Sequence, residues 1–233
     1  DYLCGRGANQ GMCTQPCRWD YAVVERTRPG QYMPVLEEDG TSFLFNSKDL
    51  CLLPVWNRVM RLNVHGLKIE GRNRTALYVA TTTAVYRRAR DAWLKDPDGF
   101  VADEAWLEEV RKTSHREYFT GFFTGRPDAD GINYAFKGYA HSHHLAAKVI
   151  EARAEHVVLQ ARNPLVAGME LEWLSSSFER RAFVLEGTSS EGVPTRFIKP
   201  NQVFEMKVPF EPKVGELIRK PYSEGDKVVV RAK

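Results

Sequence analysis

The sequence has no long apolar run, few cysteines and little net charge, and each shortage narrows the class of protein. No stretch of 18 apolar residues occurs in the 233, which excludes a transmembrane helix. The four cysteines all precede Leu52, an uneven placement that does not suit the disulfide framework of a secreted protein. We therefore expect a reducing, cytoplasmic location. A net charge of +3 is too small to indicate nucleic-acid binding by itself.

The motifs of well-known hydrolases are also missing. Neither Gly-x-Ser-x-Gly nor His-Glu-x-x-His occurs, and no nucleophilic side chain has a histidine at a recognisable spacing. This absence counts against proteolysis. Hydrophobic residues make up 43% of the chain, which is enough for the core of one large domain or two smaller ones.

The first 133 residues alternate strand-like and helix-like segments. Short strands are expected at 21–24, 31–36, 41–45 and 66–70. Ser47 is the expected cap of a helix over 48–62, which Pro54 should bend or interrupt. Further helices are expected over 75–95 and 103–112. This alternation is typical of βαβ units with a parallel sheet.

Near residue 138 the pattern changes to short strand-like runs separated by turn residues. The runs cover 149–152, 157–161, 169–174, 182–185, 203–208 and 228–231. Their spacing is typical of a small all-β barrel. We expect an α/β domain over residues 1–133, a linker over 134–146, a β-barrel over 147–222 and a tail over 223–233.

Two cysteines lie close together in a polar segment near the start. Cys13 and Cys17 are separated by three residues, a spacing that suits thiolate coordination of an iron–sulfur cluster or zinc. The alternative is a pair of buried thiols without a ligand. Cys51 should face the core from the helix expected over 48–62.

Charged residues gather at the expected strand over 66–70. Lys68 and Glu70 would share one face of it, with Glu70 buried and ionised, while Arg72 would offer a forked donor to a carboxylate or phosphate. The carboxyl ends of parallel strands meet at one edge, so Lys48 should lie near them, and Asp49 would pair with it or favour a helix N-terminus. The alternative is a salt-bridged strand end that binds no substrate.

The stretch from Lys68 to Arg90 has six basic residues and one acidic residue, Glu70. Such a patch can neutralise phosphates, although a solvated helix face is an equal alternative. Tyr78 is expected in the core, whereas Tyr86 is the better candidate for stacking. His141, His143 and His144 are expected in a solvated loop. The RNA-binding candidates are Arg18, Arg74, Tyr86, Arg87 and Arg90.

Three motifs together resemble the collagenase-like peptidase family U32, whose catalytic type is unassigned. They are the cysteine pair between Gly11 and Trp19, Asn-Ser-Lys-Asp-Leu at 46–50, and Lys-Ile-Glu-Gly-Arg at 68–72. The resemblance is specific from Tyr2 to about Tyr134 and weaker to about Tyr222. It implies the last units of a TIM-like barrel, whose earlier strands would precede Asp1, followed by an appended β-barrel.

The resemblance also implies a function. Within the family, the sequence is most similar to members that hydroxylate the wobble uridine of tRNA to 5-hydroxyuridine in a prephenate-dependent reaction. This implies Cys13 and Cys17 as two of four iron–sulfur ligands, with the other two upstream. It also implies tRNA and a small anionic metabolite, prephenate, as partners, and no membrane. The implied catalytic residues are Lys48, Lys68, Glu70 and Arg72.

Two alternatives from other functional classes stay open. The first is a collagenase-like peptidase, as the family title suggests. The second is a fragment that binds a partner without catalysing a reaction. The cysteine pair beside a basic patch favours the RNA-modifying enzyme, and the sequence predicts no oligomeric state.

Overall fold

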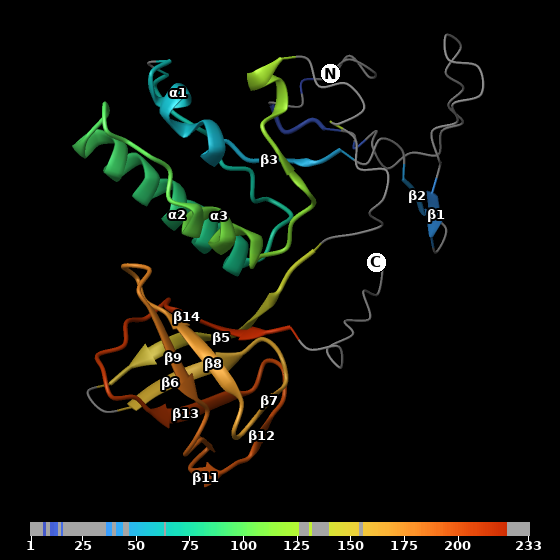
Figure 1. The fold of residues 1–233 in the computed structure, drawn as a ribbon. Coiled ribbons are helices and arrows are strands. Elements are labelled where there is room, and N and C mark those ends of the chain that lie inside the picture. Colours follow the sequence, from blue (N-terminus) through green and yellow to red (C-terminus); the bar gives the residue numbers. More distant parts are fainter. Residues whose placement is uncertain are drawn as a thin grey trace. The chain divides into compact units, whose positions relative to one another are not determined.

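The computed structural model describes a large part of the chain. The described residues are 7, 10–13, 15, 36–38, 41–43, 47–62, 64–125, 131, 140–153 and 156–222 (Figure 1). The chain divides into two compact units. Unit 1 comprises residues 1–51 and 116–139, and unit 2 comprises residues 52–115 and 140–233. Among the described residues, no helix is both long enough and apolar enough to cross a membrane.

In unit 1 the described residues form two short strand pairs. β1 (Leu36–Glu38) pairs antiparallel with β2 (Thr41–Phe43), which confirms part of the strand expected at 41–45. β3 (Asp49–Leu50) pairs parallel with β4 (Tyr118–Phe119), and a 3₁₀ turn, η4 (Gly121–Thr124), follows. The strand expected at 21–24 lies outside the described residues.

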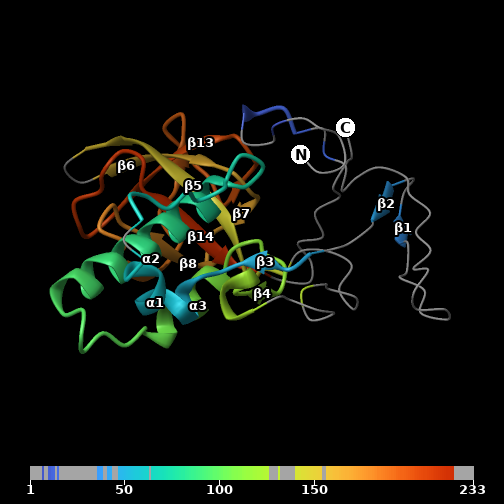
Figure 2. The same ribbon diagram turned by 90° about the horizontal axis from the view of Figure 1, so that it is seen from above.

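Unit 2 opens with helices. The long helix expected over 75–95 is confirmed as α2 (Ala76–Lys95), where the Thr75 side chain caps the helix by accepting from the N–H of Tyr78. α3 (Glu104–Arg111) is confirmed in the same way, with Asp103 as its cap. Figures 1 and 2 show α2 and α3 side by side.

The helix expected over 48–62 is wrong in its first part. Residues 49–50 form β3, and helical structure starts only with η3 (Leu53–Val55) and α1 (Trp56–Met60). Ser47 therefore caps no helix. Pro54 accounts for the change, because proline has no N–H to donate and its ring clashes with the carbonyl four residues earlier, so a helix cannot run through it from residue 50. Pro54 stands in the first turn of η3, where that missing donor costs little.

The strand expected at 66–70 is also wrong. These residues adopt no regular structure, and no backbone hydrogen bond joins them to another described segment. Alternating side chains favour a strand, but a strand also needs a hydrogen-bonded neighbour. The parallel pairing seen in the described residues is limited to β3 and β4.

Most of the described remainder of unit 2 is an antiparallel sheet of eight strands. Their order across the sheet is β11-β10-β13-β6-β5-β14-β8-β9. In chain order the strands are β5 (His143–Ala152), β6 (His156–Ala161), β8 (Glu170–Leu174), β9 (Arg180–Val184), β10 (Ser189–Ser190), β11 (Val193–Pro194), β13 (Val203–Lys207) and β14 (Leu217–Pro221).

This sheet confirms five of the expected strand runs, while the run at 228–231 lies outside the described residues. The sheet is open among the described residues, because its end strands β9 and β11 do not pair with each other. β7 (Leu165–Val166) and β12 (Phe197–Ile198) form a separate antiparallel pair.

A hydrophobic core in unit 2 comes largely from inward side chains of this sheet. Val157 and Leu159 of β6, Trp173 of β8 and Phe204 of β13 are all at most 1% exposed. The indole N–H of Trp173 donates to Glu216 at 2.8 Å, so its one polar group is satisfied.

The domain boundaries expected at residues 133 and 147 stay a prediction. In the structure β5 begins at His143, four residues before the expected start of the barrel. Contacts also group α1, α2 and α3 with the sheet rather than with residues 1–51.

Candidate functional site

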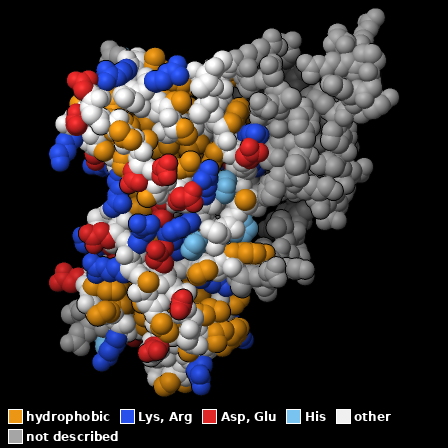
Figure 3. Space-filling model, in the orientation of Figure 1, with side chains coloured by type: hydrophobic (Ala, Val, Ile, Leu, Met, Phe, Trp, Pro, Cys, Tyr) orange, Lys and Arg blue, Asp and Glu red, His pale blue; other side chains and the backbone are white. Residues whose placement is uncertain are grey.

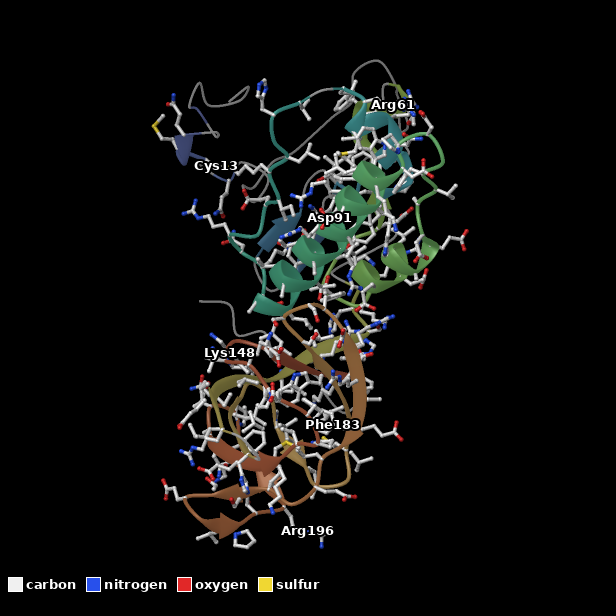
Figure 4. All side chains as sticks on the ribbon, turned by 90° about the vertical axis from the view of Figure 1, so that its left-hand side faces the viewer. Cys13, Arg61, Asp91, Lys148, Phe183 and Arg196 are labelled. Carbon is white, nitrogen blue, oxygen red and sulfur yellow. The ribbon has the colours of Figure 1, made fainter. Side chains whose placement is uncertain are left out.

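Cys13 is the member of the expected cysteine pair that the structure describes. It is a free thiol, it is exposed, and Figure 4 shows its side chain projecting from its own segment. Cys17 and Arg18 lie outside the described residues. The described part of the chain holds no group of three or more His, Cys, Asp or Glu side chains that could bind a metal ion. It therefore offers one accessible cysteine sulfur, a soft donor of the kind that iron–sulfur clusters and zinc accept.

Cys51 is 3% exposed, which confirms that it faces the core. It precedes η3 instead of lying on a helix. Its burial sets it apart from Cys13, whose thiol is exposed.

Lys48 and Asp49 form ion pairs with two consecutive residues of unit 1. The Nζ of Lys48 lies 2.7 Å from Oε1 of Glu117, and Lys48 is only 16% exposed. Arg116 donates to Asp49 three times, from its backbone N–H at 2.9 Å and from its guanidinium at 2.8 and 2.9 Å. Asp49 is thus an ion-pair partner on β3 and not a helix cap. The sequence signal for these pairs was overlooked: the doublet Lys48-Asp49 stands at β3, and the doublet Arg116-Glu117, with the charges in matching order, stands just before β4.

Lys68, Glu70 and Arg72 lie together in the exposed segment before α2. The Nζ of Lys68 is 3.7 Å from Oε2 of Glu70, and the backbone N–H of Arg72 donates to Oε1 of Glu70 at 2.9 Å. The expectation that Glu70 is buried is wrong: its side chain is 69% exposed, because the segment joins no sheet that could cover it.

Glu70 nevertheless stays ionised. The hydrogen bond from the Arg72 N–H, aided by the charge of Lys68, holds the pKa of Glu70 below its usual value. The Arg72 side chain is exposed, and among the described residues its guanidinium makes no ion pair. Arg72 is therefore the group of this segment that is available to an anionic ligand.

The basic residues of α2 have partners that the residue count overlooked. Asp91, one residue beyond the counted stretch, pairs with Arg87 at 3.1 Å and with Arg90 at 2.5 Å. The hydrogen bonds from Arg90 and then Arg87 lower the pKa of Asp91. Arg88 donates to the carbonyls of Ser177 and Phe178. Figure 3 accordingly shows Lys and Arg side chains interspersed with Asp and Glu on the face in view.

Two other RNA-binding candidates are held within unit 2. Arg74 donates to the carbonyl of Ser114 at 3.2 Å and stacks over the ring of Tyr78 at 5.0 Å. The hydroxyl of Tyr86 accepts from the N–H of Leu52 at 2.9 Å, and its ring packs edge-on against Trp56. These contacts fix the positions of both side chains within unit 2.

A buried ionic cluster was missed altogether at the sequence level. Glu109 of α3 is 3% exposed and pairs with Lys112, with Arg180 of β9 and with Arg219 of β14. Arg219 is fully buried and also pairs with Glu172 of β8. No local pattern marks Glu109, since a glutamate in an amphipathic helix is normally solvated. The cluster joins α3 to the sheet.

The expectation of a solvated histidine loop is wrong. His143 and His144 lie on β5, because the sheet extends further towards the N-terminus than the apolar pattern suggested. The rings of His141 and His144 pack together at 4.6 Å, and both contact Tyr222. Burial, followed by the charges of Arg219 and Lys112, lowers the pKa of His143 to about 4.

The model of peptidase family U32 matches residues 1–133. A Bacillus subtilis (strain 168) protein named tRNA hydroxylation protein P1 is 31% identical over 188 residues, which cover 80% of this chain and 44% of that protein. A Porphyromonas gingivalis protein named collagenase is 30% identical over 120 residues, or 51% of this chain and 28% of that one.

A solved structure also matches, the C-terminal domain of a Geobacillus thermoleovorans putative U32 peptidase. It shares 23% sequence identity with this chain, and the TM-score is 0.32. The match covers 99% of that domain and 33% of this chain. The chain spans less than half the length of the two curated relatives.

Proposed function

The chain belongs to peptidase family U32, and on that premise we propose that it serves the hydroxylation of the wobble uridine of tRNA to 5-hydroxyuridine, in a prephenate-dependent reaction. The observation that carries the proposal is the 31% identity with tRNA hydroxylation protein P1. That similarity covers 188 residues, more than the 133 that the family model matches, so it extends into the part of the chain after residue 133.

Cys13 and Cys17 are the proposed ligands of an iron–sulfur cluster. The free, exposed thiol of Cys13 supports this, because soft thiolate sulfur is the donor that such clusters prefer. A bound cluster would supply electron transfer. The protein's part is to present the two thiolates on a polar segment.

Arg72 is the proposed binding group for a carboxylate of prephenate. Its guanidinium is exposed, and a planar fork binds a carboxylate through two parallel hydrogen bonds. Glu70 accepts from the Arg72 backbone and pairs with Lys68, so it would orient both cations. We assign Lys48 to the same reaction, with Glu117 holding its side chain.

Arg18, Arg74, Tyr86, Arg87 and Arg90 remain the proposed tRNA contacts. Arg87 and Arg90 are about half exposed or more, and they could exchange Asp91 for a phosphate at little cost because such surface pairs are weak. We also propose that β3 and β4 belong to a TIM-like barrel and that the open sheet corresponds to the appended β-barrel. In support, β3 and β4 are parallel and are joined by a crossover that contains helices.

A chimera tests this function. The chain replaces the matched segment of Bacillus subtilis tRNA hydroxylation protein P1, in a strain lacking that protein, and 5-hydroxyuridine-derived nucleosides in tRNA are quantified by mass spectrometry. The chimera should restore them. Cys13→Ala and Cys17→Ala should abolish both the modification and the iron content of the purified chimera.

Cys51→Ala is the matched control, because Cys51 is buried and is not a proposed ligand. It should keep both modification and iron. A folded chimera that leaves tRNA unmodified would refute the proposed reaction, and iron retained in Cys13→Ala would refute the ligand assignment.

A collagenase-like peptidase is the second candidate, favoured by the similarity to the Porphyromonas gingivalis collagenase. Among the described residues, one hydroxyl–imidazole hydrogen bond is seen, between Ser142 and His143 at 2.9 Å. With a pKa of about 4, His143 is a weak general base at neutral pH. Hydrolysis of gelatin that is lost in Ser142→Ala would establish the peptidase. A chain that binds RNA but supports no reaction would match the remaining alternative, a fragment that binds a partner without catalysis.

A further inference from the structure

Phe197 is the one exposed phenylalanine among those described in unit 2. Its side chain is 50% exposed, whereas Phe178 and Phe204 are at most 6% exposed. It lies on β12 directly opposite Val166 of β7, which is 40% exposed. The next pair along, Ile198 and Leu165, is fully buried. The strand pair therefore anchors one face in the core and presents an aromatic ring on the other.

The backbone around Phe197 is held on several sides. The N–H of Ala167 donates to the carbonyl of Arg196 at 2.9 Å, and the hydroxyl of Thr195 donates to the carbonyl of Phe197 at 3.0 Å. The N–H of Lys199 donates to the side chain of Gln202 at 3.0 Å. A ring carried by a fixed backbone loses little entropy when a ligand stacks on it.

Cationic residues stand on either side of Phe197 in the sequence. Arg196 and Lys199 are both exposed, and neither makes an ion pair with another described residue. Figure 4 shows Arg196 extending outward at the end of the sheet. This differs from Arg153, directly after β5, and from Arg181 of β9, which pair with Glu151 and Glu179.

We propose that Phe197, with Arg196 and Lys199, is a stacking site for an unpaired nucleotide of RNA. The inference rests on the proposed function for its choice of RNA and adds a contact on the β7–β12 strand pair. An aromatic face binds any base, and adjacent unpaired cations bind the phosphates on either side of it. A protein partner is less favoured, because one phenylalanine and one valine form a small apolar area rimmed by positive charge.

The test measures binding of the whole chain to a fluorescein-labelled 12-nucleotide oligouridine by fluorescence anisotropy. Phe197→Ala should raise the Kd about fivefold or more, the loss expected for one stacked base. Arg196→Ala and Lys199→Ala should each reduce the salt dependence, lowering the slope of log K against log salt by roughly 0.7. Phe197→Tyr should bind like the parent chain, since it keeps the ring.

Phe122→Ala is the matched control, because Phe122 is 78% exposed and belongs to unit 1. It should leave the Kd unchanged, and thermal unfolding should show that Phe197→Ala is folded. If the parent chain binds the oligouridine and Phe197→Ala binds equally well, this inference is overturned while the proposed function stands. If the parent chain binds no RNA, the assignment of RNA as partner fails as well. Weaker binding of a gelatin peptide by Phe197→Ala, with RNA binding unchanged, would assign the surface to a protein.

Discussion

Glu109 of α3 and Arg219 of β14 form an ion pair in which the two side chains are 4% and 0% exposed. Lys112 and Arg180 also contact Glu109, and Glu172 contacts Arg219. Such a pair adds little to stability as a whole, since both charges lose their hydration. Removing one partner is costly, because the other charge is left buried without compensation.

Glu109→Gln should therefore lower the free energy of unfolding by about 3 kcal/mol. The measurement is urea unfolding at neutral pH. Glu108→Gln is the matched control on the same helix, because the pair of Glu108 with Arg111 is exposed and should contribute less than ~1 kcal/mol. Equal unfolding midpoints for the two variants would show that the buried pair is not the link between α3 and the sheet.

Stability should fall as the pH drops from about 6.5 to about 4, because of His143. Its pKa is about 4 in the folded state, lowered first by burial and then by Arg219 and Lys112, with Glu172 and Glu109 opposing. In this window the unfolded chain binds a proton that the folded chain does not, so acid favours unfolding. The loss should reach about 1–3 kcal/mol.

His143→Gln should flatten that slope, as measured by urea midpoints at several pH values. A second loss should follow below about pH 4.5 from Glu109. Burial raises the pKa of Glu109, but Arg219 and Lys112 together outweigh that effect and leave it lowered. An unchanged slope between pH 4 and 6.5 in His143→Gln would show that His143 is not the titrating group.

Arg72→Lys should impair tRNA hydroxylation by the chimera roughly tenfold or more, although the charge is kept, because lysine cannot form two parallel hydrogen bonds to a carboxylate. The measurement is the rate of 5-hydroxyuridine formation at varied prephenate concentration. Lys68→Arg serves as the control, since Lys68 contacts Glu70 loosely at 3.7 Å. Full activity of Arg72→Lys would remove Arg72 from the prephenate site.

Tyr86→Phe should destabilise unit 2 by about 1 kcal/mol, because the N–H of Leu52 loses its hydrogen-bond acceptor. Thermal unfolding measures the effect. Affinity for oligouridine should not change, since the ring is retained. Weaker RNA binding with unaltered stability would instead assign the hydroxyl to RNA contact.

If the chain is cleaved at a protease site inserted within residues 134–139, its two fragments should stay associated. Arg88 donates to Ser177 and Phe178, and Glu109 pairs with Arg180 and Arg219, so both helices bind the sheet. The two fragments should co-elute on gel filtration. Separation into a free sheet fragment would support the boundary expected near residue 147 as a true limit of independent folding.

Local sequence was sufficient for much of the secondary structure. Thr75 and Asp103 are caps that can be read directly, and α2 and α3 begin just after them. The runs of β8 and β13 were recognisable because apolar residues alternate in them, and β6 because it is a short apolar run; turn residues bound all three. The same alternation misled at 66–70, where the side chains alternate but the described residues supply no neighbouring strand.

The candidate site divides in the same way. The sequence by itself determined which residues carry usable chemistry: the thiol of Cys13, the fork of Arg72, and the charges of Lys68 and Glu70. Only the tertiary structure decided which charges are already neutralised. Asp91 pairs with arginines on its own helix, whereas Arg219 meets Glu109 across 110 positions of sequence. Burial and ion pairing depend on neighbours in space, which residue type and local spacing do not specify.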